Sequence, residues 1–253
     1  IWDMRDWSPE TDPYAEFLRA EIPLQKRINA FKPTQANPQL DSDAQIMLMQ
    51  GDYGNAFIDG MPYNNTFSYQ TLNFWQYTDY YSPWHGAVTA KVPENLWDWE
   101  GSLSDPDAWM KRQFEFGILN IPNPAYTNAA HKNGVMSIAC IYFDQSFREG
   151  QTVDELFIKD ENGRYIVADK LIEMANYFGY DGYFFNCEES PYSYDVLKEW
   201  LDQLEEAGLY TQYYDTNSSF DEEKAAWLYS DINGDGVKEK IQDSVFVNYD
   251  WPY

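Results

Sequence analysis

Short apolar runs alternate with longer amphipathic stretches along much of this 253-residue chain. The apolar runs have the length and composition of β-strands, and they lie at Ala44–Gln50, Phe74–Tyr81, Val135–Phe143, Asp181–Glu188, Tyr210–Tyr214 and Ser244–Trp251. Apolar residues recur at helical spacing in Asp12–Phe31 (interrupted by Pro23), Tyr126–Asn133, Val167–Phe178 and Tyr194–Glu206. Strands that alternate with helices indicate parallel β–α units and an α/β fold.

The number of strands sets the expected architecture. A closed (β/α)₈ barrel needs eight strands, whereas the pattern supplies about six, and the last of them runs to the end of the chain. A sheet that stops there leaves unpaired edges and an incomplete core. We therefore expect one domain over residues 1–253, a TIM barrel truncated after about six strands, with the C-terminal part of the barrel missing.

The net charge of the chain argues against some kinds of binding partner. The chain has 42 acidic and 17 basic residues, a net charge of −25. Nucleic acids and anionic membranes attract Lys and Arg, so this charge argues against both. No run reaches the roughly 18 apolar residues of a membrane span, so no membrane insertion is expected. An acidic, solvated surface suits a secreted protein, and we expect an extracellular or cell-surface location in a bacterium, with a cytoplasmic location left open.

Cysteines and histidines give little sign of a metal or a cross-link. Cys140 and Cys187 each lie inside an apolar run, which indicates buried free thiols rather than a disulfide. With only His85 and His131 beside them, these thiols do not indicate a zinc site. Aromatic residues make up 18% of the chain, more than a core needs, and rings with polar handles suit both sugar stacking and ordinary packing.

The stretch Gly179–Ser190 (GYDGYFFNCEES) carries the clearest functional pattern. In a β-strand, Phe184, Asn186 and Glu188 point to one face, and the amide and carboxyl groups stand roughly 6.5–7 Å apart. Both lie at the C-terminal end of the strand, where α/β barrels carry their catalytic groups. The alternative is structural, with Asn186 bonded to neighbouring backbone and Glu188 paired with an Arg or Lys. Acidic residues on buried strands are uncommon without a partner or a function.

An amide next to a carboxyl suits one kind of sugar chemistry. Most glycosidases use two carboxyl groups, but a substrate with a 2-acetamido group supplies its own nucleophile, the acetamide oxygen. The enzyme then needs one acid/base, a role that fits Glu188. It also needs a polar group that orients the acetamide, and Asn186 can accept from its N–H without ionising.

Five segments add a wider pattern. In chain order they are His85–Gly86 after a strand, Ile121–Val135 (IPNPAYTNAAHKNGV), Asp181–Glu188 (DGYFFNCE), Gln212–Thr216 (QYYDT) and Asp243–Trp251 (DSVFVNYDW). These segments resemble, in the same order, the motifs of the family 85 endo-β-N-acetylglucosaminidases, whose catalytic strand carries Asn-x-Glu after Asp-Gly. Their ordered occurrence is much more specific than any one of them. The chain departs from the family's usual residues at Tyr213, where Trp is common, and at Cys187, which faces away from the site.

The resemblance implies a TIM barrel enzyme that cleaves N-linked glycans between the two GlcNAc residues of their chitobiose core. It implies retention of configuration through an oxazoline intermediate, with no cofactor required. By position, Asn186 would orient the acetamide, Glu188 would be the acid/base and Tyr214 would hydrogen-bond near the acetamide. Substrate-binding residues are then expected at His85, Phe184, Tyr249 and Trp251.

Two other functions remain open. The same strand can be aligned with the signature of family 18 chitinases, in which Asn186 occupies a position where that family has Asp. That departure and the flanking segments favour family 85. A barrel that binds glycans without turning them over is the alternative from another class.

A second motif concerns metal binding. Asp231, Asn233 and Asp235 occupy positions 1, 3 and 5 of an EF-hand-like loop, with Gly236 at position 6. Position 12 is Gln242, which removes the bidentate carboxylate. The motif therefore predicts either a structural calcium ion without a catalytic role or an acidic surface turn.

Overall fold

The computed structural model describes residues 1–27, 44–50, 74–84, 89–90, 114–115, 118–143, 153–188, 194–215, 222, 226, 228–231 and 234–246. Its helices (α), 3₁₀ helices (η) and strands (β) are α1 (Trp2–Asp6), η1 (Ala15–Leu18), β1 (Met47–Gln50), η3 (Trp75–Tyr77), β2 (Tyr80–Pro83), β3 (Thr89–Ala90), β4 (Phe114–Glu115), β5 (Leu119–Asn120), α5 (Pro124–Lys132), β6 (Met136–Phe143), η5 (Val153–Phe157), α6 (Ile166–Phe178), β7 (Gly182–Cys187), α7 (Tyr194–Glu206), β8 (Tyr210–Asp215), β9 (Tyr229–Ser230), β10 (Glu239–Lys240) and β11 (Ser244–Phe246).

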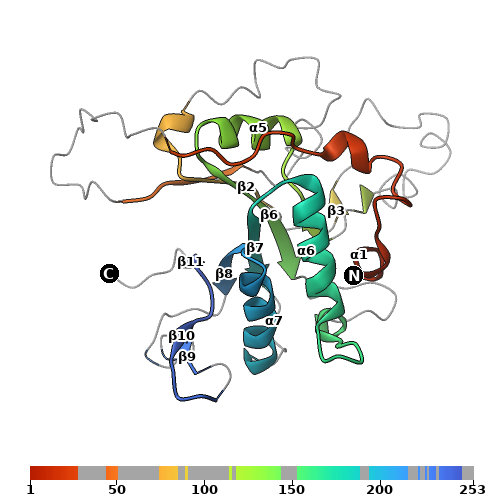
Figure 1. The fold of residues 1–253 in the computed structure, drawn as a ribbon, viewed down its shortest axis with the longest axis vertical. Helices are drawn as coiled ribbons and strands as arrows, with labels where there is room; N and C mark the ends of the chain where they lie inside the picture. Colours follow the sequence, from red (N-terminus) through yellow and green to blue (C-terminus); the bar gives the residue numbers. More distant parts are fainter. Residues whose placement is uncertain are drawn as a thin grey trace, which may run out of the picture.

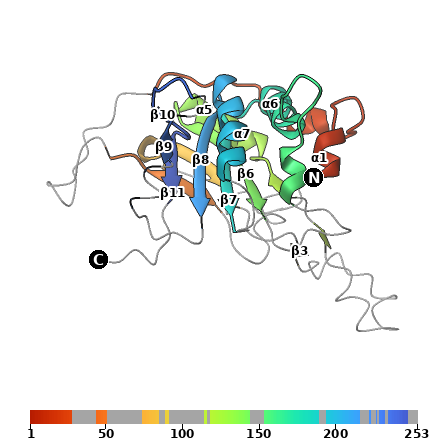
Figure 2. The same ribbon diagram turned by 90° about the horizontal axis from the view of Figure 1, so that it is seen from below.

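One parallel sheet organises the molecule. Within the described residues, six parallel strands follow the order β1-β2-β6-β7-β8-β11, and β5 pairs antiparallel with β6. The order follows the sequence without reversal, as in a barrel rather than a doubly wound sheet. Figure 2 shows β6, β7 and β8 with their arrowheads at the same end of the sheet. This arrangement confirms the predicted α/β fold and corresponds to part of a TIM barrel.

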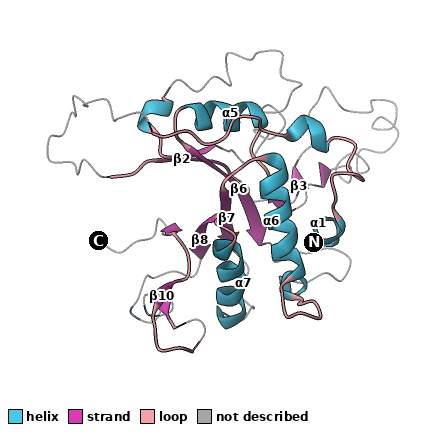
Figure 3. Cartoon of the chain, in the orientation of Figure 1, coloured by secondary structure: helices cyan, strands magenta, loops and turns pink. Residues whose placement is uncertain are grey.

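Helices cover one face of this sheet. Figures 1 and 3 show α6 and α7 side by side along the sheet. Helix α5 lies across the part of the sheet that contains β2 and β6. The main apolar core lies between the helices and the odd-numbered residues of β6, β7 and β8. Trp200 of α7 is fully buried there, with its ring centroid 5.2 Å from that of Phe185. Cys187 belongs to the same core, whereas Cys140 lies on the opposite face of the sheet. Both thiols are buried and neither belongs to a disulfide, as predicted.

The other face is the inside of the curved sheet. Its apolar residues form a second cluster that draws Ile138, Cys140, Phe184 and Tyr214 from three neighbouring strands. Gly182 lets two of these strands approach, because a Cβ on it would lie 2.0 Å from the carbonyl oxygen of Tyr210. The inner face therefore has an apolar cluster beneath the C-terminal ends of β6, β7 and β8.

The strongest sequence patterns match the structure closely. The predicted strands at Val135–Phe143 and Asp181–Glu188 correspond to β6 and β7, and the predicted helices at Val167–Phe178 and Tyr194–Glu206 correspond to α6 and α7. Helix α5 begins two residues before its predicted start, because Asn123 caps it by accepting from the amide of Ala125 at 2.9 Å and Pro124 occupies its first turn.

The predicted helix at Asp12–Phe31 is wrong for the part that the structure describes. Between residues 12 and 27 the helical segment is the short η1. The backbone amides of Glu21 and Ile22 donate to Asn128 Oδ1 at 2.9 Å, and the amide of Ala20 donates to the Phe178 carbonyl at 2.8 Å. These donors are bound to other elements and are unavailable to an i−4 ladder, and Pro23 has no N–H to give.

The predicted strand at Phe74–Tyr81 is wrong in its first half. Residues Trp75–Tyr77 form η3, and the strand β2 begins at Tyr80. The carbonyl groups of this turn accept from the Arg27 guanidinium, which contacts the oxygens of Trp75, Gln76 and Thr78. A cation that caps the C-terminal carbonyls of a helical turn favours the turn over a strand.

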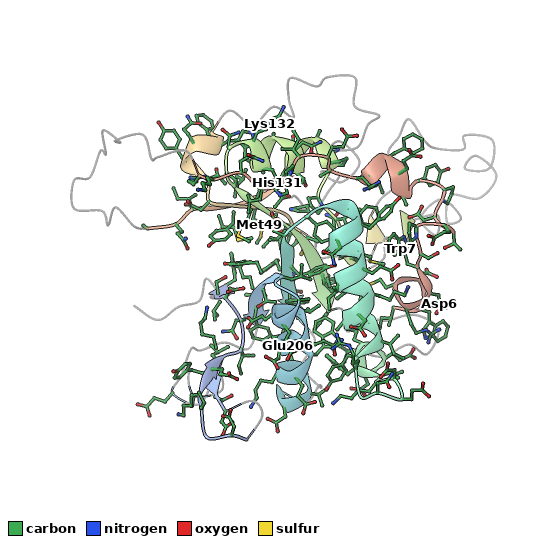
Figure 4. The ribbon with its side chains drawn as sticks, in the orientation of Figure 1. Asp6, Trp7, Met49, His131, Lys132 and Glu206 are labelled. Carbon is green, nitrogen blue, oxygen red and sulfur yellow. The ribbon has the colours of Figure 1, made fainter. Side chains whose placement is uncertain are left out.

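Residues 1–27 form an extended N-terminal segment, called the strap below, that lies against α6 and α5. Figure 4 labels Trp7 beside α6 and His131 on α5, and the segment runs between these two helices. Its end at Arg27 packs directly on Gly134, where a Cβ would lie 2.4 Å from the Arg27 Cα. Gly134 also has φ +70°, a conformation that favours glycine. The AAHKNGV segment thus joins α5, the strap and β6.

Candidate active site

Four strands bring one residue each to a common row at their C-terminal ends. In the strand register Tyr142 of β6 lies opposite Asn186 of β7, Asn186 lies opposite Tyr214 of β8, and Tyr214 lies opposite Phe246 of β11. Residues paired in register on neighbouring strands share a face of the sheet. All four therefore stand on the inner face, at the end where barrels carry out chemistry.

The amide and carboxyl groups predicted from the sequence are in contact. Asn186 Nδ2 donates to Glu188 Oε1 at 3.2 Å. Asn186 is 1% exposed and Glu188, just past the end of β7, is partly buried. A carboxylate only accepts hydrogen bonds, so the nitrogen end of the amide faces Glu188 and the oxygen end faces away. This orientation leaves a carbonyl oxygen on the side away from the acid.

Tyr142 is a site residue that sequence reasoning missed. Its hydroxyl donates to Glu188 Oε2 at 3.3 Å, and the residue is 8% exposed. It lies 46 positions before Glu188 in the chain, so no local spacing links the two. A signal was present, because Tyr142 is the hydroxyl-bearing residue near the C-terminal end of a mostly apolar strand.

Aromatic rings pack against one another within this row and beneath it. Phe246 packs edge-on against Tyr214, with ring centroids 5.7 Å apart, and against Phe184 at 5.6 Å. Phe184 is 1% exposed and belongs to the inner cluster, with Trp84 packed against it. Edge-to-face pairs of this kind fix ring orientation. The sequence-predicted residue Phe184 thus lies beneath the site rather than open on its surface.

A polar group forms part of the floor one level below. Ser244 Oγ accepts from Tyr210 Oη at 2.7 Å and from Gln212 Nε2 at 2.8 Å. Burial raises the pKa of Tyr210 to about 12, against the opposing effect of its hydrogen bond to Ser244. The hydroxyl of Tyr210 therefore stays neutral and holds β8 to β11, which keeps Tyr214 and Phe246 in register.

Several predicted site residues lie outside the described part of the chain. They are His85, Tyr249, Trp251 and, from the calcium motif, Asn233. Their predicted roles stay predictions, as do the catalytic roles of Asn186, Glu188 and Tyr214.

The described part of the calcium motif forms a tight turn. Asp231 accepts from the amides of Gly234 at 2.7 Å and Gly236 at 2.8 Å, and Asp235 accepts from that of Val237 at 2.7 Å. Among the described residues, no group of three or more His, Cys, Asp or Glu side chains gathers closely enough to hold a metal ion. Calcium binding by this loop stays a prediction.

No helix in the described part of the chain is both long enough and apolar enough to cross a membrane.

Comparison with known proteins identifies the family. The Cytosolic endo-beta-N-acetylglucosaminidase of Danio rerio is 30% identical over 146 residues, which cover 54% of this chain and 20% of that protein. The human protein of the same name is 33% identical over 78 residues, 30% of this chain and 10% of that protein. The chain thus spans a fifth or less of these relatives' length. Their names say cytosolic, which gives no support to the expected extracellular location.

A solved structure and a family model are each similar to most of this chain. The glycoside hydrolase domain Endo-D of Streptococcus pneumoniae superposes with a TM-score of 0.65 at 18% identity, covering 99% of this chain and 37% of that one. It supports the barrel fold. The family described as Glycosyl hydrolase family 85 matches residues 54–253, which include the whole row from Tyr142 to Phe246 and Glu188. This chain belongs to glycosyl hydrolase family 85.

Proposed function

We propose that this chain carries the catalytic face of an endo-β-N-acetylglucosaminidase that hydrolyses the GlcNAc-β1,4-GlcNAc bond in the core of N-linked glycans. The observation that carries the proposal is the contact between the Asn186 amide and the Glu188 carboxyl, with Tyr214 in register beside them. An acid next to an amide, without a second carboxylate in this row, fits a substrate that brings its own nucleophile.

In the first step the acetamide oxygen of the sugar attacks its own anomeric carbon. The bond from that carbon to the glycosidic oxygen breaks, and the leaving GlcNAc takes the proton of Glu188. The acetamide becomes a cyclic oxazolinium ion and Glu188 becomes a carboxylate. A positioned acid typically contributes about 10²–10⁴-fold to such a step.

In the second step a water molecule attacks the anomeric carbon from the face that the leaving group vacated. The Glu188 carboxylate takes a proton from this water, the bond to the acetamide oxygen breaks, and the acetamide re-forms. Two displacements at one carbon retain its configuration. Glu188 ends the cycle protonated and ready for the next glycan.

Asn186 and Tyr214 favour the ring closure of the acetamide. The amide oxygen of Asn186, turned away from Glu188, can accept from the acetamide N–H, which gains positive charge as the ring closes. Tyr214 is 6% exposed and packs against Phe246, so the position of its hydroxyl oxygen is restricted. Together they hold the acetamide oxygen on the anomeric carbon, which makes the attack effectively intramolecular.

Chitinase activity and glycan binding without turnover are the other outcomes of the test. The full natural polypeptide that contains this chain is incubated with an N-glycoprotein rich in mannose and with chitin oligomers. A loss of mass that leaves one GlcNAc on each Asn supports the proposal. Cleavage of chitin oligomers alone, or glycan binding without cleavage of either substrate, contradicts it.

A further inference from the structure

The two carboxyl oxygens of Glu188 are held by different strands. Oε1 accepts from Asn186 on the same strand, β7, and Oε2 accepts from Tyr142 on its neighbour, β6. On the other side of Asn186 stands Tyr214 of β8. The acid therefore has one oxygen bound to the acetamide-orienting amide and one bound to a phenol on the opposite side.

The two partners of Glu188 differ in whether they can bind a protonated carboxyl oxygen as well as an ionised one. The Asn186 Nδ2 group has hydrogens and no lone pair to accept with, so its partner Oε1 has to keep a lone pair for it. The Tyr142 hydroxyl can donate to a carboxylate oxygen or accept from a protonated one, because a phenol is both donor and acceptor. When Glu188 takes up its proton, the arrangement favours Oε2 as the oxygen that carries it, because Oε1 then stays a carbonyl oxygen, the better acceptor for the amide, and Oε2 keeps a partner in the phenol.

We propose that Glu188 delivers its proton from Oε2, so that the leaving GlcNAc lies on the β6 side of the site, next to Tyr142. This inference rests on the proposed function and adds to it the side of the site on which the leaving group lies. The acetamide lies toward β8, between Asn186 and Tyr214, and the leaving group lies toward β6. Tyr142 is a positioning residue, which acts through Glu188 by holding the oxygen that carries the proton.

The surroundings of Tyr142 suit this role. It is 8% exposed, and its strand register with Asn186 fixes its distance from the acid. Its phenol reaches Glu188 from the end of β6, and the two inner residues that precede it there, Ile138 and Cys140, are fully buried and apolar. A hydrogen bond in such a setting is stronger than in water, because water competes for it less.

The test compares two leaving groups in a Tyr142→Phe variant of the full natural polypeptide. One substrate is the natural glycan, whose GlcNAc leaving group needs a proton. The other is the same sugar attached to 2,4-dinitrophenol, which leaves as a stable anion and needs none. We expect kcat/KM for the glycan to fall roughly 10- to 100-fold, the loss of one hydrogen bond to a charged group, and kcat/KM for the aryl glycoside to change less than about threefold.

Two matched tyrosines serve as controls. Tyr81→Phe also removes a buried hydroxyl, one that donates to Gln50 Oε1 at 2.9 Å on the helix-covered face, and we expect both substrates to react as before. Tyr214→Phe removes a hydroxyl on the acetamide side, and we expect it to slow both substrates by a similar factor, because both need the acetamide to attack.

The ratio of the two kcat/KM values gives a readout that a structural role alone would not move. A loss of folded protein or of sugar binding lowers both values by the same factor, whereas a misplaced acid lowers only the value for the substrate whose leaving group needs a proton. Tyr81→Phe should leave that ratio unchanged.

Either of two results overturns the inference while the proposed function stands. The first is a Tyr142→Phe variant that loses activity equally on both substrates, and the second is one that loses none. A wild-type protein that cleaves neither substrate contradicts the proposed function itself, and the inference falls with it.

Discussion

The imidazole of His131 bridges two acceptors that belong to different parts of the chain. Its Nε2 lies 2.8 Å from Asp181 Oδ2, at the start of β7, and its Nδ1 contacts the carbonyl oxygen of Ile22 in the N-terminal strap. A carboxylate and a carbonyl both only accept, so the ring satisfies both as an imidazolium ion. Burial lowers the pKa of His131, but the hydrogen bond to Asp181, its negative charge and the Ile22 carbonyl together raise the pKa above its usual value.

This raised pKa predicts how stability depends on pH. Because the folded state binds the His131 proton more tightly than the unfolded state, the pair stabilises the fold fully below the unfolded pKa of about 6.5. The contribution is lost as the pH rises through the folded pKa. We expect His131→Gln to lower the free energy of unfolding by about 1.5–3 kcal/mol at pH 6, and by less at pH 9.

Urea denaturation of wild type and variant across this range is the measurement. Groups that titrate equally in both proteins cancel in the difference. A difference in unfolding free energy that is constant from pH 6 to pH 9, or that grows with pH, would show that His131 is not held as an imidazolium ion.

Replacing the proposed acid separates chemistry from binding. Glu188→Gln keeps the size of the side chain but has no proton to give, so we expect kcat for glycan cleavage to fall by about 10²–10⁴-fold or more. Glycan binding, followed by isothermal titration calorimetry, should stay close to that of the wild type. Near-normal turnover by this variant would refute the assignment of Glu188.

Removing the amide should affect the two chemical steps unequally. In Asn186→Ala the acetamide loses its orienting partner, so oxazoline formation suffers, whereas a preformed oxazoline is already closed. We expect glycan cleavage to slow about 10²-fold or more, with hydrolysis of the synthetic glycan oxazoline affected much less. Unimpaired cleavage of the glycan would contradict this role.

The close approach of β7 to β8 at Gly182 predicts that a methyl group added there lowers the free energy of unfolding. In Gly182→Ala the new Cβ meets the Tyr210 carbonyl oxygen at 2.0 Å, and a strand backbone has little room to move. We expect a loss of about 3 kcal/mol or more in the free energy of unfolding. Gly163→Ala is the matched control, because nothing lies within 4 Å of its Cβ and only its φ of +82° opposes the change, at about 1–2 kcal/mol. Equal losses in the two variants would show that the close approach costs nothing.

The parts of the fold that could be predicted are those whose apolar pattern is continuous over a whole element. Strands β6 and β7 and helices α6 and α7 are of this kind, because their burial requires the pattern that identifies them. The strap up to Arg27 could not be predicted in the same way. Its backbone donors and its guanidinium bind Asn128, Phe178 and the carbonyls of η3, partners far away in the sequence.

The residues of the candidate site also differ in how far the sequence alone predicts them. Asn186 and Glu188 are two residues apart, so strand alternation alone predicts that they share a face. Tyr214 was expected from the resemblance to a family, and its place opposite Asn186 follows from a register that the sequence does not state. Tyr142 joins the site through the register of β6 with β7, which depends on the packing of the whole sheet.

The two thiols described above lie on opposite faces of one sheet, Cys140 toward the barrel interior and Cys187 toward the helices. Side chains that leave a sheet in opposite directions cannot join across it without unfolding a strand. The fold is therefore built without a cross-link and gains nothing from an oxidising medium. Reducing agents should therefore leave the free energy of unfolding unchanged.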